Sequence, residues 1–245
     1  MRRCLVLAEF AVAACALDNG FMRPPLGWSA LYGAPFSTVN ETIVRAAAQG
    51  LVSGGFAAAG YEYVTLDDWY ADRGPDGRIR GIPEFWPSGL PSTSAFVHGL
   101  GLKFGVYSAA SQRTCGNCKA LRNCFMNSVF RAHRAPHCTD SASQFVERLD
   151  ADTFANEWQI DYLKYGKGGS SASLALFWCI ATSCADSCIY NNGVANRGRY
   201  TTMRDALNAT GRRIFYSMEG STFEPDVGNM VRTGGDIWPR WDACV

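Results

Sequence analysis

Charged side chains stand at the ends of several strand-like segments of this sequence. Asp67 and Asp68 directly follow one such segment, and Glu219 follows another. Lys164 lies close to the end of a third. Carboxylate and ammonium groups make strong hydrogen bonds to a polar ligand, and they can equally pair with one another in an ion-pair network. These segments are rich in aromatic and β-branched residues and span residues 61–66, 213–217 and 160–165.

The elements that must position these side chains alternate between strand and helix. Six segments are predicted as strands: 26–30, 61–66, 102–107, 160–165, 213–217 and 231–235. Helical spacing of apolar residues recurs in segments 40–54, 143–157 and 200–209, the first with a cap at Thr38 or Asn40. This alternation predicts an α/β fold with a parallel sheet, and a (β/α)8 barrel collects its site at the C-terminal ends of the strands.

Two features qualify the barrel prediction. Six strands are two fewer than a closed eight-stranded barrel needs. A doubly wound open sheet would place a ligand at the same strand ends, but no Gly-x-Gly-x-x-Gly turn follows the first strand, which disfavours a nucleotide fold. Segments 115–137 and 168–198 are rich in small and polar residues and cysteine, and they are predicted either as long loops over the strand ends or as disordered or mistranslated stretches.

The composition limits the kind of partner. The 23 Lys and Arg residues nearly balance the 22 Asp and Glu residues, so no strong field favours nucleic acid, a membrane surface or a highly charged substrate. No apolar run after the N-terminus is long enough to span a bilayer. We therefore expect a neutral partner, without nucleic acid or membrane.

The N-terminus has the features of a secretory signal. Met1-Arg2-Arg3 is basic, an apolar stretch follows, and small residues lead up to residue 16, which leaves residues 17–245 as one domain. A short buried helix is the alternative. Sequons at Asn40 and Asn208 agree with secretion to an extracellular, vacuolar or lysosomal destination.

Cysteine usage also agrees with an oxidising compartment. Of ten cysteines, eight remain once Cys4 and Cys15 are removed with the signal, an even number that favours disulfides. Cys115, Cys118, Cys124 and Cys138 could instead form a thiolate zinc site, which a secreted context disfavours.

Seven motifs in the sequence resemble those of the α-galactosidases (melibiases) of family 27 of the glycoside hydrolases, and they occur in the same order across nearly the whole chain after the signal. They are LDNGF (17–21), PPLGW (24–28), YVTLDDW (63–69), FWPSGL (85–90), GLKFGVYS (101–108), DYLKY (161–165) and VRTGGDI (231–237). The resemblance implies a (β/α)8 barrel followed by a β-sandwich domain. It also implies release of terminal α-linked galactose with retention of configuration, from an oligosaccharide or glycoconjugate and without a metal or organic cofactor.

The resemblance also implies roles for individual residues. Asp236 matches the acid/base of the family, which protonates the leaving oxygen and later activates water. The residues that match sugar-binding positions are Asp67, Asp68, Lys164, Glu219 and Arg232. Related N-acetylgalactosaminidases tend to carry smaller residues near the place of Glu219, so galactose is the expected sugar.

Several positions depart from the family pattern. Retaining hydrolysis needs a nucleophilic carboxylate, and Gly166 stands in its place. Asp161 is a poor substitute, because five strand residues of about 3.3 Å each put it roughly 16 Å away. Leu31 replaces a tryptophan that packs on galactose, Gly168 replaces a bridged cysteine, and segment 218–220 is shorter than its counterpart.

The sequence ends at Val245, before the last two barrel strands and the β-domain that the resemblance implies. Three hypotheses follow from these departures. The chain is a glycoside hydrolase of α-galactosidase type, a galactose-binding protein without catalysis, or an incomplete gene product whose exposed sheet edges prevent stable folding.

Overall fold

Six parallel strands form the centre of the molecule. The computed structural model describes residues 19–21, 23–33, 39–110, 114, 143, 146–166, 196–219 and 224–233. All neighbouring strands pair in parallel, and the sheet forms a half-barrel, which confirms the predicted α/β class and strand number. The strand order is β1 (Gly27–Ser29), β2 (Tyr63–Thr65), β5 (Lys103–Ala109), β6 (Tyr162–Gly166), β7 (Phe215–Met218) and β8 (Met230–Val231).

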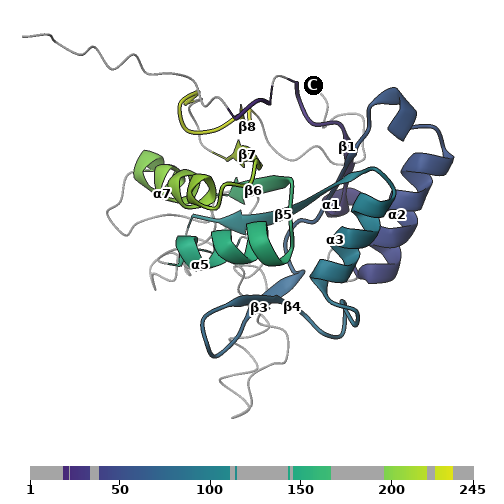
Figure 1. Cartoon of the computed structure of the whole chain (residues 1–245), viewed down its shortest axis with the longest axis horizontal. Helices are drawn as coiled ribbons and strands as arrows, with labels where there is room; N and C mark the ends of the chain where they lie inside the picture. Colours follow the sequence, from purple (N-terminus) through teal and green to yellow (C-terminus); the bar gives the residue numbers. More distant parts are fainter. Residues whose placement is uncertain are drawn as a thin grey trace, which may run out of the picture.

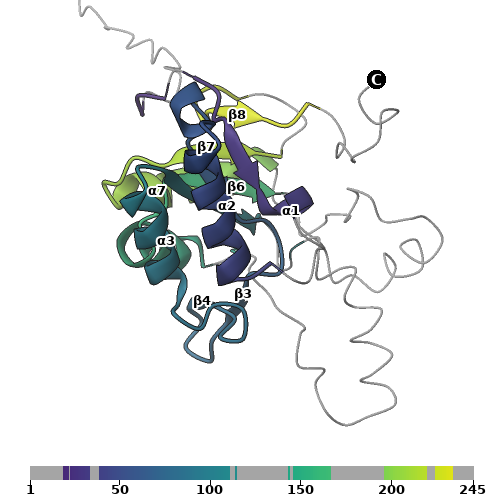
Figure 2. The same cartoon turned by 90° about the vertical axis from the view of Figure 1, so that its right-hand side faces the viewer.

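Helices connect these strands and cover one side of the sheet. Figures 1 and 2 show α2, α3 and α7 on the same side, as right-handed crossovers between parallel strands require. Short helical turns accompany the longer helices. The helices are α1 (Ala30–Gly33), α2 (Glu41–Ser53), α3 (Leu90–Gly99), α5 (Glu147–Asp152) and α7 (Asn196–Ala209), with a 3-10 turn (Ala57–Ala59) and a π-helical turn (Thr153–Glu157).

The helix boundaries agree with the sequence best where a cap fixes them. The side chain of Asn40 accepts a hydrogen bond from the backbone N–H of Ile43, so Asn40 is the cap of α2. The helix predicted from residue 143 begins only at Glu147. Helix α7 begins at Asn196, so the last three residues of the predicted loop 168–198 are helical.

Helix α3 and one β-hairpin are among the elements that were not predicted from the sequence. Helix α3 lies between β4 and β5, and an antiparallel hairpin pairs β3 (Ala71–Arg73) with β4 (Ile79–Gly81). The Arg73 guanidinium donates two hydrogen bonds of 2.8 Å to the carboxylate of Asp150, whose side chain is fully buried in α5. This bidentate ion pair connects the hairpin to α5. A contact between residues so far apart in the sequence cannot be predicted from a local pattern.

The core is apolar and continuous across the sheet. Val64, Phe104, Val106 and Leu163 from the three central strands are each 0% exposed. Strands buried on both faces are typical of parallel sheets that helices cover.

The segment that precedes the edge strand β1 also contacts the opposite edge of the sheet, at β7 and β8. The side-chain amides of Asn19 and Asn229 exchange hydrogen bonds of 3.0 and 2.7 Å, and the Asn19 amide also donates to the carbonyl of Ile214. The ring of Phe21 packs edge-on against Phe215 at 5.4 Å. Residues near the start of the chain thus contact the starts of β7 and β8.

Several sequence predictions fall on residues outside the described part of the structure. These are the signal at residues 1–16, all ten cysteines with their disulfide or zinc alternatives, most of the two irregular segments, and Asp236. They stay predictions. Within the described ranges, no helix is long and apolar enough to cross a bilayer.

Candidate functional site

A pair of buried carboxylates follows β2. Asp67 and Asp68 are each 9% exposed. The backbone N–H of Asp68 donates to Asp67 at 2.9 Å, and that of Trp69 donates to Asp68 at 3.1 Å. Trp69 has φ 66°, a left-handed conformation that is costly for a bulky residue and that clusters at functional sites. The strained corner fixes the direction of both carboxylates.

Lys164 joins this corner to another strand. Its side chain rises from β6, and its ammonium lies 2.8 Å from Asp67 Oδ2 and 3.2 Å from Glu219 Oε1. Burial disfavours the ammonium form, but the charges of Asp67 and Glu219 outweigh burial and raise the pKa of Lys164 above its usual value. Lys164 therefore stays a cation bridging two carboxylates.

The aromatic ring of Tyr107 supports the same ammonium. Lys164 Nζ lies 5.0 Å from the centre of this ring, within the range of a cation–π contact. Tyr107 on β5 is the strand partner of Lys164 on β6, so the two side chains leave the sheet side by side. Tyr107 was not among the site residues predicted from the sequence, although its place as the last residue of the predicted strand 102–107 was a usable signal.

Arg232 extends the charged group beyond β8. Its guanidinium lies 3.4 Å from Glu219 Oε1, the same oxygen that faces Lys164. Asp67, Glu219 and Arg232 follow the C-terminal ends of β2, β7 and β8. We call Asp67, Lys164, Glu219 and Arg232 the rim cluster. Negative and positive side chains alternate along the rim cluster. Its members therefore form the ion-pair network that the sequence analysis offered as an alternative to ligand binding.

Gly166 ends β6 beside the rim cluster. A Cβ atom on Gly166 would lie 2.7 Å from Tyr107 Cε2, 2.8 Å from Tyr107 Oη and 2.8 Å from Glu219 Oε2. Such contacts are shorter than side chains tolerate. The place where the resemblance calls for a nucleophile is thus closely surrounded by Tyr107 and Glu219.

Asp161 lies at the other end of β6, as the strand arithmetic predicted. It accepts hydrogen bonds from His98 Nε2 at 2.7 Å, from the backbone N–H of Phe104 at 2.9 Å and from Arg212 at 2.8 Å. Burial acts to raise the pKa of Asp161, but these hydrogen bonds and the nearby cations outweigh burial and lower it. Asp161 is a structural anion and does not replace the missing nucleophile.

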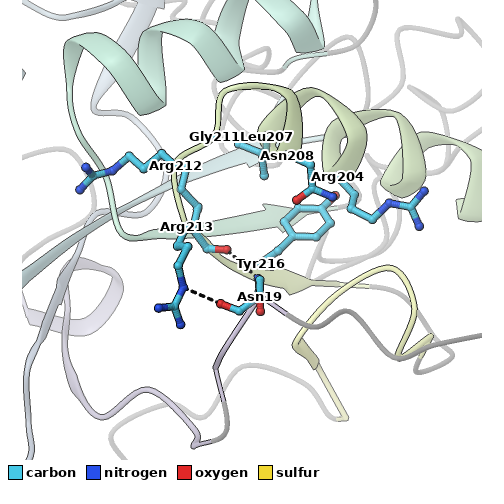
Figure 3. A pocket seen from close by; sticks show the side chains of 9 residues that line it. Asn19, Arg204, Leu207, Asn208, Gly211, Arg212, Arg213 and Tyr216 are labelled. Atoms are coloured by element: carbon cyan, nitrogen blue, oxygen red, sulfur yellow. Dashed lines mark hydrogen bonds between the residues drawn. The ribbon is translucent and has the colours of Figure 1, made fainter.

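A hollow of about 210 Å³ lies at the start of β7, away from the rim cluster. Figure 3 shows the side chains of Arg204, Arg212 and Arg213 pointing apart rather than toward a common point. Arg212 pairs with Asp161, Arg213 donates to the backbone of Asn19, and Arg204 donates to the backbone of Asp226. The hollow therefore offers no convergent anion site.

The structure brings four of the predicted site residues into direct contact, namely those of the rim cluster, and places Asp68 next to Asp67. Asp236 lies outside the described residues. Among those that are described, no group of three or more histidine, cysteine, aspartate or glutamate side chains could hold a metal ion. The arrangement can accept and donate several hydrogen bonds to a hydroxyl-rich ligand.

The sequence and fold are similar to those of known proteins. The family model described as Alpha galactosidase A (Melibiase_2) matches residues 32–127. Alpha-galactosidase 3 of Arabidopsis thaliana is 35% identical over 238 residues, which are 94% of this chain and 44% of the relative. The α-galactosidase of Cyamopsis tetragonoloba is 33% identical over 93% of this chain and 47% of its own length. The chain spans about half the length of the curated relatives it matches.

Two solved structures share the fold at similar coverage. The chain matches α-galactosidase I of Mortierella vinacea with a TM-score of 0.58 and 30% identity, over 82% of this chain and 41% of that one. It matches the α-galactosidase of Saccharomyces cerevisiae with raffinose with a TM-score of 0.65 and 26% identity, over 89% and 41%. Since these matches extend along nearly the whole chain, it belongs to the α-galactosidase (melibiase) family, family 27 of the glycoside hydrolases.

Proposed function

We propose that this chain binds a terminal α-linked galactose of an oligosaccharide or glycoconjugate at the rim cluster and hydrolyses that linkage with retention of configuration. The supporting observation is the Lys164 ammonium held between Asp67 and Glu219 at the C-terminal ends of the strands. A barrel of this class assembles its active site at these ends. The family membership and the neutral charge balance agree with a neutral sugar.

Each residue has a part in this proposal. Asp67 and Asp68 accept hydrogen bonds from sugar hydroxyls, while Lys164 and Arg232 donate to them, and charged partners make these bonds stronger than neutral ones. Asp236 is proposed as the acid/base that protonates the leaving oxygen. The reaction needs no metal or organic cofactor, because proton transfer and a carboxylate suffice for glycoside hydrolysis.

A second candidate is a galactose-binding protein without catalysis. The observation that favours it is the absence of a carboxylate on Gly166, the last residue of β6. The two candidates share the binding site and differ only in the chemical step. Both therefore predict saturable binding of galactose.

The test compares two lysines in similar settings. Lys164 and Lys103 each lie 5.0 Å above a tyrosine ring and pair with a glutamate, but Lys103 is at the opposite end of the sheet. Calorimetry with galactose should show saturable binding to the unaltered chain and to Lys103→Met. Lys164→Met should weaken binding at least about tenfold, because a charged hydrogen bond contributes about 1.5–3 kcal/mol.

Release of nitrophenol from p-nitrophenyl α-galactoside separates the candidates. Release by the unaltered chain, lost in Lys164→Met, would support the hydrolase. Binding without release would favour the non-catalytic protein. A chain that shows no heat with millimolar galactose would contradict both.

A further inference from the structure

The surroundings of Gly166 contain a carboxylate that belongs to another strand. Glu219 follows β7, and its backbone N–H donates to the carbonyl of Tyr165 at 3.2 Å, so Glu219 is registered beside the end of β6. Its Oε2 lies 2.8 Å from the point where a Cβ atom on Gly166 would stand. The glycine therefore leaves room for the glutamate to approach the end of β6.

The distance fits the replacement of one carboxylate by another. The carboxylate oxygens of an aspartate lie about 2.4 Å from its own Cβ, given C–C and C–O bonds of about 1.5 and 1.2 Å. Glu219 Oε2, at 2.8 Å from the same point, reaches a similar distance from the end of the strand. A glutamate is one methylene longer than an aspartate, which lets it extend from β7 toward β6.

The two oxygens of Glu219 have different surroundings. Lys164 at 3.2 Å and Arg232 at 3.4 Å pair with the same oxygen, Oε1. Oε2 is the oxygen that lies 2.8 Å from the point where a Cβ atom on Gly166 would stand. Two cations on one oxygen hold the carboxylate in a fixed direction.

We propose that Glu219 is the catalytic nucleophile of this chain, in place of the carboxylate that Gly166 lacks. This inference rests on the proposed hydrolase function. Oε2 forms a bond to the anomeric carbon while the glycosidic carbon–oxygen bond breaks, and the acid/base, assigned to Asp236 above, gives its proton to the leaving oxygen. Water then adds to the anomeric carbon from the leaving-group side, gives a proton back to the acid/base, and releases the glutamate carboxylate.

This assignment predicts the outcome of Gly166→Asp. A new aspartate at that position would collide with Tyr107 and Glu219, so it should lower activity instead of restoring it. The double change Gly166→Asp with Glu219→Ala removes the glutamate from the contact and moves the carboxylate back to β6. It should therefore be more active than Gly166→Asp alone.

The experiment uses the full chain, Glu219→Gln, and a matched control, Glu224→Gln, whose carboxylate pairs with Arg197 outside the rim cluster. The substrate is 2,4-dinitrophenyl α-galactoside, whose leaving group needs no protonation. Glu219→Gln should cleave it more than about a thousandfold more slowly than the unaltered chain, as expected for loss of a nucleophile. Glu224→Gln should cleave within about threefold of the unaltered chain, and all three proteins should unfold cooperatively.

Covalent labelling identifies the nucleophile directly. A 5-fluoro-α-galactosyl fluoride should form a stable ester, and mass spectrometry should place it on the peptide that contains Glu219. Azide added to Glu219→Ala should yield β-galactosyl azide, because the small anion attacks from the nucleophile's side. A label on another residue, or Glu219→Gln cleavage within tenfold of the unaltered chain, would overturn the assignment.

Binding measurements separate the failure of this inference from that of the proposed function. If the unaltered chain binds galactose yet neither cleaves nor takes the label, Glu219 is not a nucleophile and the non-catalytic candidate stands. If it neither binds nor cleaves, both proposals fall. A Glu219→Gln loss confined to the KM, with kcat unchanged, would make Glu219 a hydroxyl-binding residue only.

Discussion

At the scale of single residues, the importance of Gly166 lies in the side chains that surround it, which the residue type alone does not reveal. Among the described glycines, those whose Cβ position has no atom within 4 Å lie in helices or turns. Gly166 instead ends a buried strand, and its Cβ position is close to the side chains of Tyr107 and Glu219. Its missing side chain is what allows the two neighbours to approach. The sequence showed that a carboxylate was absent there, and only the structure showed what stands next to the position.

Gly166→Ala should therefore destabilise the protein. The added methyl group would lie 2.7–2.8 Å from Tyr107 and Glu219, and overpacking of this kind costs about 1–3 kcal/mol of unfolding free energy. Gly50→Ala in α2 is the matched control, since nothing lies within 4 Å of its Cβ position. That control should gain about 0.5–1 kcal/mol from helix propensity. Urea titration of both variants measures the difference, and equal effects would contradict the crowding argument.

At the scale of elements, the β3–β4 hairpin depends on one buried ion pair. Asp150 has no exposed side-chain surface, and both its oxygens accept from the Arg73 guanidinium. Breaking a buried pair from one side leaves a charge without its partner, which is more costly than losing an exposed pair.

Arg73→Ala should lower the free energy of unfolding by about 3 kcal/mol, because the Asp150 carboxylate would remain buried. Arg80→Ala on the same hairpin is the control: its pair with Asp76 is largely exposed, and its loss should cost much less than the loss of the buried pair. Chemical denaturation measures both. A loss for Arg73→Ala no larger than that for Arg80→Ala would show that the pair does not hold the hairpin.

The β3–β4 hairpin and helix α3 were not predicted because neither has a clear local sequence pattern. The hairpin strands are only three residues long, too short for an alternating pattern, and their position depends on the contact between Arg73 and Asp150 across 77 positions. Helix α3 has a weak separation of polar and apolar faces, with Thr93 and Ser94 buried beside Leu90 and Val97. In contrast, α2 was predicted closely because Asn40 signals its start locally.

At the scale of the whole molecule, different charged groups lie at the C-terminal and the N-terminal ends of the parallel strands. The rim cluster gathers at the C-terminal ends of the strands. At the opposite ends, Asp161 joins the last turn of α3, the start of β5 and the segment before β7. The exchange between Asn19 and Asn229 ties the segment before β1 to β8 over 210 positions. These contacts join segments that are far apart in the sequence at the ends of the strands opposite the rim cluster.

Asp161 should make stability depend on pH. Its pKa is lower in the folded than in the unfolded chain, so its contribution is fully present above the unfolded value of about 3.9 and is lost as the pH falls through the folded value. Asp161→Asn should lower the melting temperature at pH 7, and the gap to the unaltered chain should close below about pH 4.

The control for this pH profile is Asp205→Asn, an exposed carboxylate paired with Arg204. Its effect should be small and nearly constant over the same range, since exposed pairs contribute little. A gap for Asp161→Asn that persists unchanged at pH 3 would mean that its hydrogen-bonded neighbours, rather than its charge, stabilise the fold.

Local periodicity and side-chain chemistry were enough to predict the parallel α/β class, the six strands and the residue types at their C-terminal ends. The tertiary structure decided which of those side chains meet. Lys164 bridges Asp67 and Glu219, and the side chains of Tyr107 and Glu219 surround Gly166. Contacts between strands depend on register and on the space that each side chain leaves for its neighbours, and these are properties of the packed sheet rather than of any one segment.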